Sequence, residues 1–149
     1  MAFGEETTAK VAAMIASKLN ADLIVNEKML DGATVVVAGT HVRMGKFNKR
    51  YIRFVKKYAA KVRIYTFIVG AEIEKKQKYV DLAEKDSGGK AWYVWGELNA
   101  NKAKGLKKFA LQAFIDGRRQ DGLPTPRLLD KEIAALCREV MLENQITEK

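Results

Sequence analysis

Two apolar runs limit most strongly what this chain can fold into. Residues 33–38 read Ala-Thr-Val-Val-Val-Ala and stand between Gly32 and Gly39, and residues 62–69 form a second β-branched and aromatic run that ends at Gly70. A continuous apolar run is typical of a strand buried on both faces, as in a parallel sheet with helices on either side. The first expectation is therefore a covered, mostly parallel sheet.

Helical spacing fills the intervals between the strands. Before the first run, Val11, Ile15 and Leu19 fall on one helix face. The predicted helices span residues 8–19, 46–60, 72–85, 104–115 and 129–143, and two further strands span 21–25 and 91–95. A hydroxyl of Thr7 or Thr8 is expected to cap the first helix. The alternation of strands and helices predicts an α/β fold, with residues 1–149 forming a single domain.

Composition narrows the class of protein. The chain has 149 residues, of which 48% are hydrophobic, enough for one domain with its own core. Cys137 is the only cysteine, which excludes an internal disulfide and a cysteine metal site, and no metal is expected. No apolar run reaches the ~18 residues of a membrane span, and the first residues do not resemble a secretory signal. We therefore expect a reducing, cytoplasmic location.

The formal net charge of +9 is concentrated in one segment. Nine basic residues and no acidic residue lie between Arg43 and Arg63. The positive electrostatic field of such a segment would attract nucleic acid, an anionic membrane surface, or an anionic cofactor or substrate. Phe47, Tyr51 and Phe54 share one stripe of the predicted helix, which favours a core role over base stacking and makes nucleic acid an unlikely partner. An acidic protein or an anionic membrane surface fits better.

Three glycines stand where predicted strands end. Gly39, Gly70 and Gly96 each follow an apolar run. In open parallel sheets, ligands bind beyond the carboxyl ends of the strands, and glycine lets the backbone approach a ligand closely. A glycine also simply ends many strands, and that interpretation is favoured for any one of the three. Their recurrence at one rim makes a ligand site there a reasonable hypothesis.

Two segments resemble a known family. Residues 3–12, Phe-Gly-Glu-Glu-Thr-Thr-Ala-Lys-Val-Ala, resemble the flavodoxin phosphate loop running into its first helix. Residues 39–48, Gly-Thr-His-Val-Arg-Met-Gly-Lys-Phe-Asn, resemble a loop and helix start in the flavodoxin-domain group that includes quinone-linked protoporphyrinogen IX dehydrogenase. The likeness continues through residues 96–98, the predicted helix at 104–115 and residues 128–140, and it covers nearly the whole chain. It implies a flavodoxin-like three-layer sandwich.

The resemblance also implies a cofactor, flavin mononucleotide (FMN), and the residues that hold it. The phosphate loop would bind the FMN phosphate through hydroxyls and backbone N–H groups, and the loops after the later strands would flank the ring. Arg43 would stabilise a reduced, anionic flavin or an acidic substrate, and His41 would stack on the ring or donate a hydrogen bond. The alternatives are that Arg43 is a solvated charge of the basic helix and that His41 is an ordinary histidine of a surface loop. The predicted cofactor-binding residues are Gly4, Glu5, Thr7, Thr8, Thr40, His41, Val42, Arg43, Gly70 and Ala71.

The start of the chain departs from the family pattern. Flavodoxins open with an apolar strand of about five residues, placed inside the sheet in the order 2-1-3-4-5, whereas only Met1–Phe3 precedes Gly4 here. Four explanations are open. Either Met1–Phe3 is a short remnant of that strand, or the sheet closes differently, or a second chain completes it, or the natural start lies upstream. A homodimer would cover an exposed edge.

Two functions follow from the sequence. The first is an FMN-binding redox protein, either an electron carrier or a quinone-linked oxidoreductase, whose basic helix faces a redox partner protein or a quinone at an anionic membrane surface. The alternative is a flavin-free binding or interaction domain that uses the same basic helix. The short start, the acidic pair Glu5 and Glu6, and the lack of ring-flanking aromatics favour the alternative.

Overall fold

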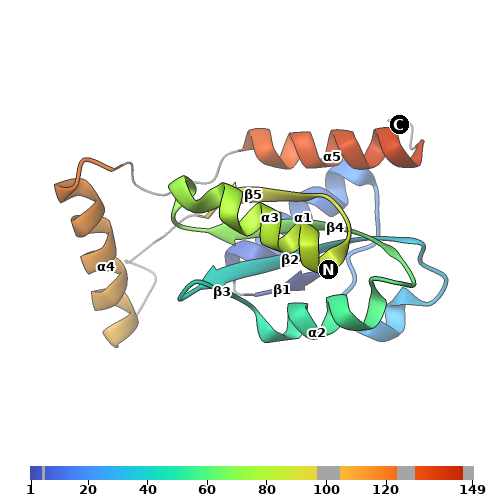
Figure 1. Ribbon diagram of the computed structural model, residues 1–149, viewed down its shortest axis with the longest axis horizontal. Helices are drawn as coiled ribbons and strands as arrows, with labels where there is room; N and C mark the ends of the chain where they lie inside the picture. Colours follow the sequence, from blue (N-terminus) through green and yellow to red (C-terminus); the bar gives the residue numbers. More distant parts are fainter. Residues whose placement is uncertain (5, 97–104, 124–129, 146–149) are drawn as a thin grey trace.

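The computed structural model describes residues 1–4, 6–96, 105–123 and 130–145, and these form a sheet covered by helices (Figure 1). The strands are β1 (Ala2–Phe3), β2 (Val35–Arg43), β3 (Lys46–Phe47), β4 (Arg63–Gly70) and β5 (Ala91–Trp95). The α-helices are α1 (Glu6–Leu19), α2 (Lys49–Tyr58), α3 (Lys76–Ser87), α4 (Gly105–Gln120) and α5 (Asp130–Asn144), and two 3-10 turns are η1 (Glu27–Leu30) and η2 (Ile73–Lys75). None of the described helices is long and apolar enough to cross a membrane.

The sheet is mostly parallel, as predicted. Its strands lie in the order β1-β2-β4-β5, and every neighbouring pair in that path is parallel. The exception is β3, which pairs antiparallel with the end of β2. Because parallel neighbours need crossover helices, the chain covers both faces of the sheet. The predicted α/β three-layer sandwich with a short N-terminal strand is confirmed.

Each face of the sheet has its own core. The period of two along a strand sends Ile64 and Ile68 of β4 to one side, and Tyr65 and Phe67 to the other. On the first side lie the buried side chains of α2 and α3, which are Tyr51, Phe54, Val55, Tyr79 and Ala83. On the second lie those of α1 and α5, which are Val11, Ala12, Ile15, Leu19, Ile133, Leu136, Cys137 and Val140. The aromatic stripe of the basic helix is thus core, as predicted.

The predicted strand at residues 21–25 is wrong. This segment has no regular structure, and Leu23 and Val25 are 44% and 71% exposed. A strand needs a neighbour with free backbone groups, and β1 offers only Ala2 and Phe3, which pair with Gly39 and Thr40. The apolar run therefore has no extended edge beside it.

The predicted boundary between the first long strand and the basic helix is also wrong. Strand β2 continues through Gly39 to Arg43, and α2 begins only at Lys49. Met44 and Gly45 have φ values of 50° and 74°, the left-handed pair of a tight hairpin turn, which folds Lys46 back onto Arg43. Asn48 then caps α2, because its side chain accepts a hydrogen bond of 2.8 Å from the Arg50 N–H.

Helix α4 stands apart from the sandwich, at the left of Figure 1. Its anchor is Arg118, which is only 5% exposed and donates to both carboxylate oxygens of Glu74 at 2.8 and 3.2 Å. This forked contact holds the pKa of the Glu74 carboxyl below its usual value. At the other end of α4, Leu106 and Phe109 are 88% and 75% exposed.

Candidate functional site

The carboxyl ends of β1, β2 and β4 meet at one rim, where the chain enters α1. Phe3 of β1 pairs with Thr40 of β2, so Gly4 comes beside His41. The contact is close, because a Cβ on Gly4 would lie 2.5 Å from Thr8 Oγ1 and 2.6 Å from His41 Nδ1. Three predicted site residues from two separate segments are thus brought together.

His41 carries the clearest chemical signal at this rim. Its Nδ1 is buried and has no hydrogen-bond partner among the described residues. A buried ring nitrogen without a partner is uncommon in a folded protein and calls for an explanation. The atom lies against Gly4, directly before α1 begins, so an unsatisfied polar atom stands at this rim.

The two threonines of the predicted phosphate loop take different positions. Helix α1 begins at Glu6, so Thr7 and Thr8 lie inside its first turn, and the prediction that one of them caps the helix is wrong. Thr8 is 1% exposed and lies close to Gly4, whereas Thr7 is half-buried. Glu6 is exposed, as expected for an acidic partner of the helix dipole. Glu5 lies outside the described residues.

The β2 residues that were predicted to lie beside the flavin ring take different positions, some in the core and some on the β2–β3 hairpin. Thr40 is fully buried, and its Oγ1 accepts the Asn48 N–H at 3.2 Å and donates to the His41 carbonyl at 3.3 Å. Val42 pairs with Phe47 and packs partly against the core. Arg43 is exposed on the hairpin arm that extends past the rim. Only His41 therefore belongs to the cluster at Gly4.

Gly70 and Ala71 form the next part of the rim, and aromatic donors hold this loop. Trp95 Nε1 donates to the Ala71 carbonyl at 2.9 Å, and the Tyr93 hydroxyl donates to the Glu72 carbonyl at 3.0 Å. A Cβ on Gly70 would lie 2.1 Å from the Tyr93 oxygen. Neither aromatic is among the residues predicted for the site, and their alternation just before Gly96 was the available signal.

The interpretation of Gly39 as a strand end is wrong. Gly39 lies inside β2, where a Cβ would come within 1.9 Å of Phe67 Cζ on the neighbouring strand. A Cβ on Gly96 would likewise meet Val69 Cγ1 at 2.7 Å. Close packing between strands accounts for these two glycines without a ligand, so the rim site rests on Gly4 and His41.

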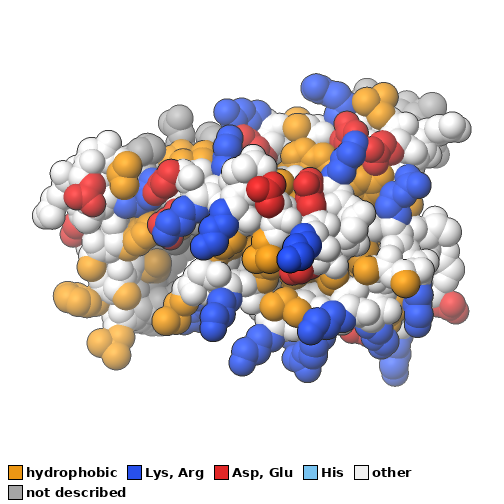
Figure 2. All heavy atoms as spheres, in the orientation of Figure 1, with side chains coloured by type: hydrophobic (Ala, Val, Ile, Leu, Met, Phe, Trp, Pro, Cys, Tyr) orange, Lys and Arg blue, Asp and Glu red, His pale blue; other side chains and the backbone are white. Residues whose placement is uncertain are grey.

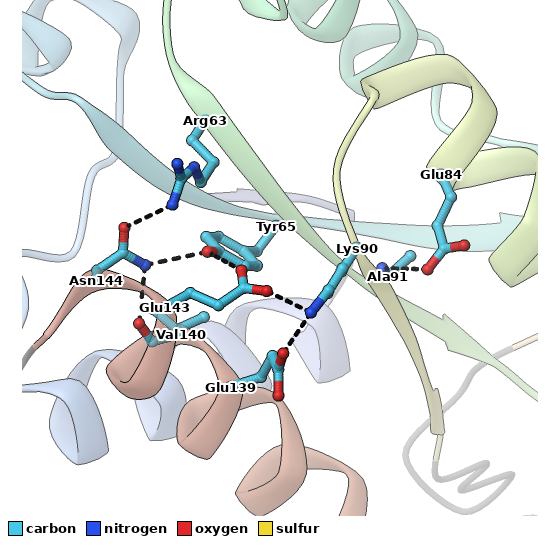
Figure 3. A network of polar contacts seen from close by, with 9 residues as sticks. All are labelled: Arg63, Tyr65, Glu84, Lys90, Ala91, Glu139, Val140, Glu143 and Asn144. Atoms are coloured by element: carbon cyan, nitrogen blue, oxygen red, sulfur yellow. Dashed lines mark hydrogen bonds and ion pairs between the residues drawn. The ribbon is translucent and has the colours of Figure 1, made fainter.

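A second polar cluster lies at the opposite end of the strands (Figure 3). Tyr65 donates to Glu143 at 2.5 Å, and Lys90 bridges Glu139 and Glu143. These bonds lower the pKa of the Glu143 carboxyl to about 2, with the Lys90 contact as the main cause. Because its members satisfy one another, the cluster fastens α5 to the sheet and is not a candidate site.

Basic side chains gather on α2. Figure 2 shows Lys and Arg along the lower edge of the molecule, where Figure 1 places this helix. The exposed members on α2 are Lys49, Arg50, Arg53, Lys56 and Lys57. Lys57 is bonded to Glu27 at 2.7 Å, which raises the pKa of the lysine. This set of five residues is called the α2 basic face below.

Searches against protein-family models, curated proteins and solved structures find no match for this chain.

Proposed function

We propose that the protein is a flavodoxin-like redox protein that binds FMN at the rim formed by Gly4, the first turn of α1 and His41. The observation that carries this proposal is the buried Nδ1 of His41, which has no partner among the described residues and faces the start of a 14-residue helix. Free N–H groups and the positive end of the helix dipole favour an anion at such a place.

The residues present fit the phosphate end of FMN. The half-buried Thr7 hydroxyl and the first N–H groups of α1 would bind phosphate oxygens, and His41 would donate to one of them. Thr8 has a positioning role, because its buried hydroxyl packs closely against Gly4. Exposed Glu6 points its charge to solvent, which limits its repulsion of a phosphate.

The ring end would be held mainly by backbone. Hydrogen bonds from Tyr93 and Trp95 to backbone carbonyls fix the loop that follows Gly70. Its backbone therefore has a defined position beside the rim. FMN supplies electron and hydride transfer when it is bound. The charge of Arg43 and the net charge of +9 would stabilise an anionic reduced flavin and so raise its potential.

A titration with FMN tests the proposal. Quenching of flavin fluorescence should reveal a single site, and Thr7→Ala should weaken FMN binding about 10-fold, the cost of one hydrogen bond to a charged oxygen. Ser17→Ala removes a hydroxyl from the exposed last turn of the same helix, so its affinity should match that of the unmodified protein. Far-UV circular dichroism of each variant checks that α1 stays folded.

Failure to retain FMN would contradict the proposal. If neither the unmodified protein nor Ser17→Ala retains FMN at about 100 μM, a concentration at which flavin sites of useful affinity are filled, the redox proposal fails. The flavin-free interaction domain then becomes the better account, with the α2 basic face as its working surface.

The α2 basic face is the proposed contact for a redox partner protein or for a quinone-bearing anionic membrane. Replacing Lys49, Arg53 and Lys56 by glutamate should abolish co-sedimentation with vesicles of anionic phospholipid, or binding to an acidic redox protein, because each lysine or arginine near such a surface contributes about 1 kcal/mol. Raising the salt concentration should also weaken binding by the unmodified protein, because salt screens the charges of the α2 basic face. Binding that persists in the triple variant would place the contact elsewhere.

A further inference from the structure

The large apolar side chains that are most exposed among the described residues come from two elements, the β2–β3 hairpin and α4. Met44, at the turn of the hairpin, is 93% exposed, and Leu106 and Phe109 of α4 come next. An isolated exposed apolar side chain is ordinary, whereas apolar side chains that share a surface with polar groups mark a contact with a partner or a membrane. These three residues are called the apolar tips below.

Helix α4 has an inner face and an outer face. Successive residues of a helix are turned by about 100°, so Leu106 stands opposite Ile115, and Phe109 stands opposite Arg118. Ile115 and Arg118 are buried, and Arg118 bonds to Glu74 on the body of the protein. Leu106 and Phe109 therefore lie on the outer face, where they contribute nothing to the core.

A single plane touches α2 and the outer end of α4. In Figure 1 the N-terminal end of α4 and the length of α2 both lie along the lower edge of the molecule, and the β2–β3 hairpin lies between them. Figure 2 shows hydrophobic side chains at this end of α4 and Lys and Arg side chains along α2. A flat surface set along the lower edge, at right angles to the picture, therefore meets both helices at the same time.

This side of the molecule is basic as well as apolar. The α2 basic face lies on it, and Glu27 is bonded to only one member of that face, Lys57. Exposed Lys46 follows the hairpin turn, and exposed Lys108 lies in the first turn of α4. The sequence contains no acidic residue from position 105 to position 115. A complementary partner is therefore anionic, and it also accepts apolar side chains.

A lipid surface fits these features better than a protein surface does. The core of a protein–protein interface is depleted of lysine, and its two sides are complementary in shape. Here the apolar tips protrude singly, beside lysines. An anionic bilayer attracts Lys and Arg to its headgroups, and its fluid interface accepts an apolar side chain wherever one protrudes. Stable binding of this kind takes two signals, such as a basic patch together with an apolar anchor.

We propose that the apolar tips insert into an anionic phospholipid membrane while the α2 basic face lies on its headgroups. This inference rests on the membrane contact in the proposed function. It commits that contact to lipid, and it adds the anchor that the basic face does not supply. Neither signal suffices alone, and insertion requires no flavin.

Vesicles of phosphatidylglycerol and phosphatidylcholine in equal amounts test the anchor by co-sedimentation. The double variant Leu106→Ser/Phe109→Ser should bind about 100-fold more weakly than the unmodified protein, because two large apolar side chains no longer leave water. Met44→Ser should weaken binding about 10-fold for the same reason. Leu142→Ser is the matched control, since it replaces an exposed leucine of α5, the helix along the opposite edge of Figure 1, and its binding should be unchanged.

Tryptophan fluorescence reports the insertion itself. The emission of Phe109→Trp should shift to the blue when these vesicles are added, because the indole leaves water, whereas Leu142→Trp should show no such shift. Unchanged vesicle binding by the double serine variant would overturn the anchor and leave the basic contact in place.

Two further results would also overturn the inference. If the unmodified protein does not bind the vesicles, the anchor and the membrane contact of α2 fail together, while the FMN titration still decides the flavin site. If the free protein is a dimer that the double serine variant dissociates, a second copy covers the apolar tips in place of lipid.

Discussion

Replacement of Gly39 by alanine is expected to lower the free energy of unfolding by about 3 kcal/mol. The new methyl group would lie 1.9 Å from Phe67 Cζ, and this ring is fully buried between β2 and the second core, so neither partner can move away. Denaturation in urea, followed by circular dichroism, measures the loss through the shift of the midpoint at constant slope.

A companion substitution identifies the cause. Phe67→Leu removes the ring atoms that an added Cβ would meet, so the double variant should be more stable than the sum of the two single effects by about 1 kcal/mol or more. If the two effects add instead, the clash is not the reason that glycine stands in β2. A Gly39→Ala protein of unchanged stability would contradict the cross-strand packing.

Replacement of Gly89 by alanine is expected to be about as damaging, with a loss of about 3 kcal/mol. A Cβ at this position would stand 1.8 Å from the backbone carbonyl oxygen of Ile64 in β4, and a backbone atom cannot rotate aside. The change would force β5 away from the sheet at its first residue, Ala91.

The adjacent Gly88 is a matched control. Its φ of 69° ends α3 in the left-handed conformation, and a Cβ there meets nothing within 4 Å. Gly88→Ala should therefore cost only about 1 kcal/mol, the strain of an alanine in that conformation. Thermal unfolding of the two variants side by side decides the matter, and a larger loss for Gly88→Ala than for Gly89→Ala would refute the contact with Ile64.

The covered parallel sheet could be predicted from the sequence because its signal is local. Strands β4 and β5 were predicted to within one residue, since both are apolar runs that end at a glycine. The five helices were predicted in the right order from the spacing of apolar side chains, with ends that shift by up to five residues.

The errors arise where structure depends on a distant neighbour. The segment at residues 21–25 has the composition of a strand, and this local signal outweighed the short start at Met1–Phe3, which leaves the adjacent edge too short to pair with it. The β2–β3 hairpin depends on the left-handed pair Met44 and Gly45, and methionine is not a residue that signals such a turn.

The candidate site shows the same division. The sequence placed Gly4, Thr8 and His41 in one site by resemblance to a family, and the fold brings Gly4 close to both Thr8 and His41. The unpartnered Nδ1 of His41 is a property of the packed protein and has no sequence signal. The packing of Gly39 against Phe67 joins residues of separate strands, so a glycine that serves packing could not be told apart from one that serves a ligand.

The most direct test of the FMN proposal is the change in backbone amide chemical shifts when FMN is added to isotope-labelled protein. The account predicts that the largest shifts fall on Gly4, Thr7, Thr8 and His41, with smaller ones at Gly70 and Ala71, and that the phosphorus resonance of FMN moves with them. Shifts confined to the α2 basic face would mean that FMN binds only as a diffuse anion, and no shifts at all would mean that it does not bind. Either result would contradict a flavin site at the carboxyl rim of the sheet.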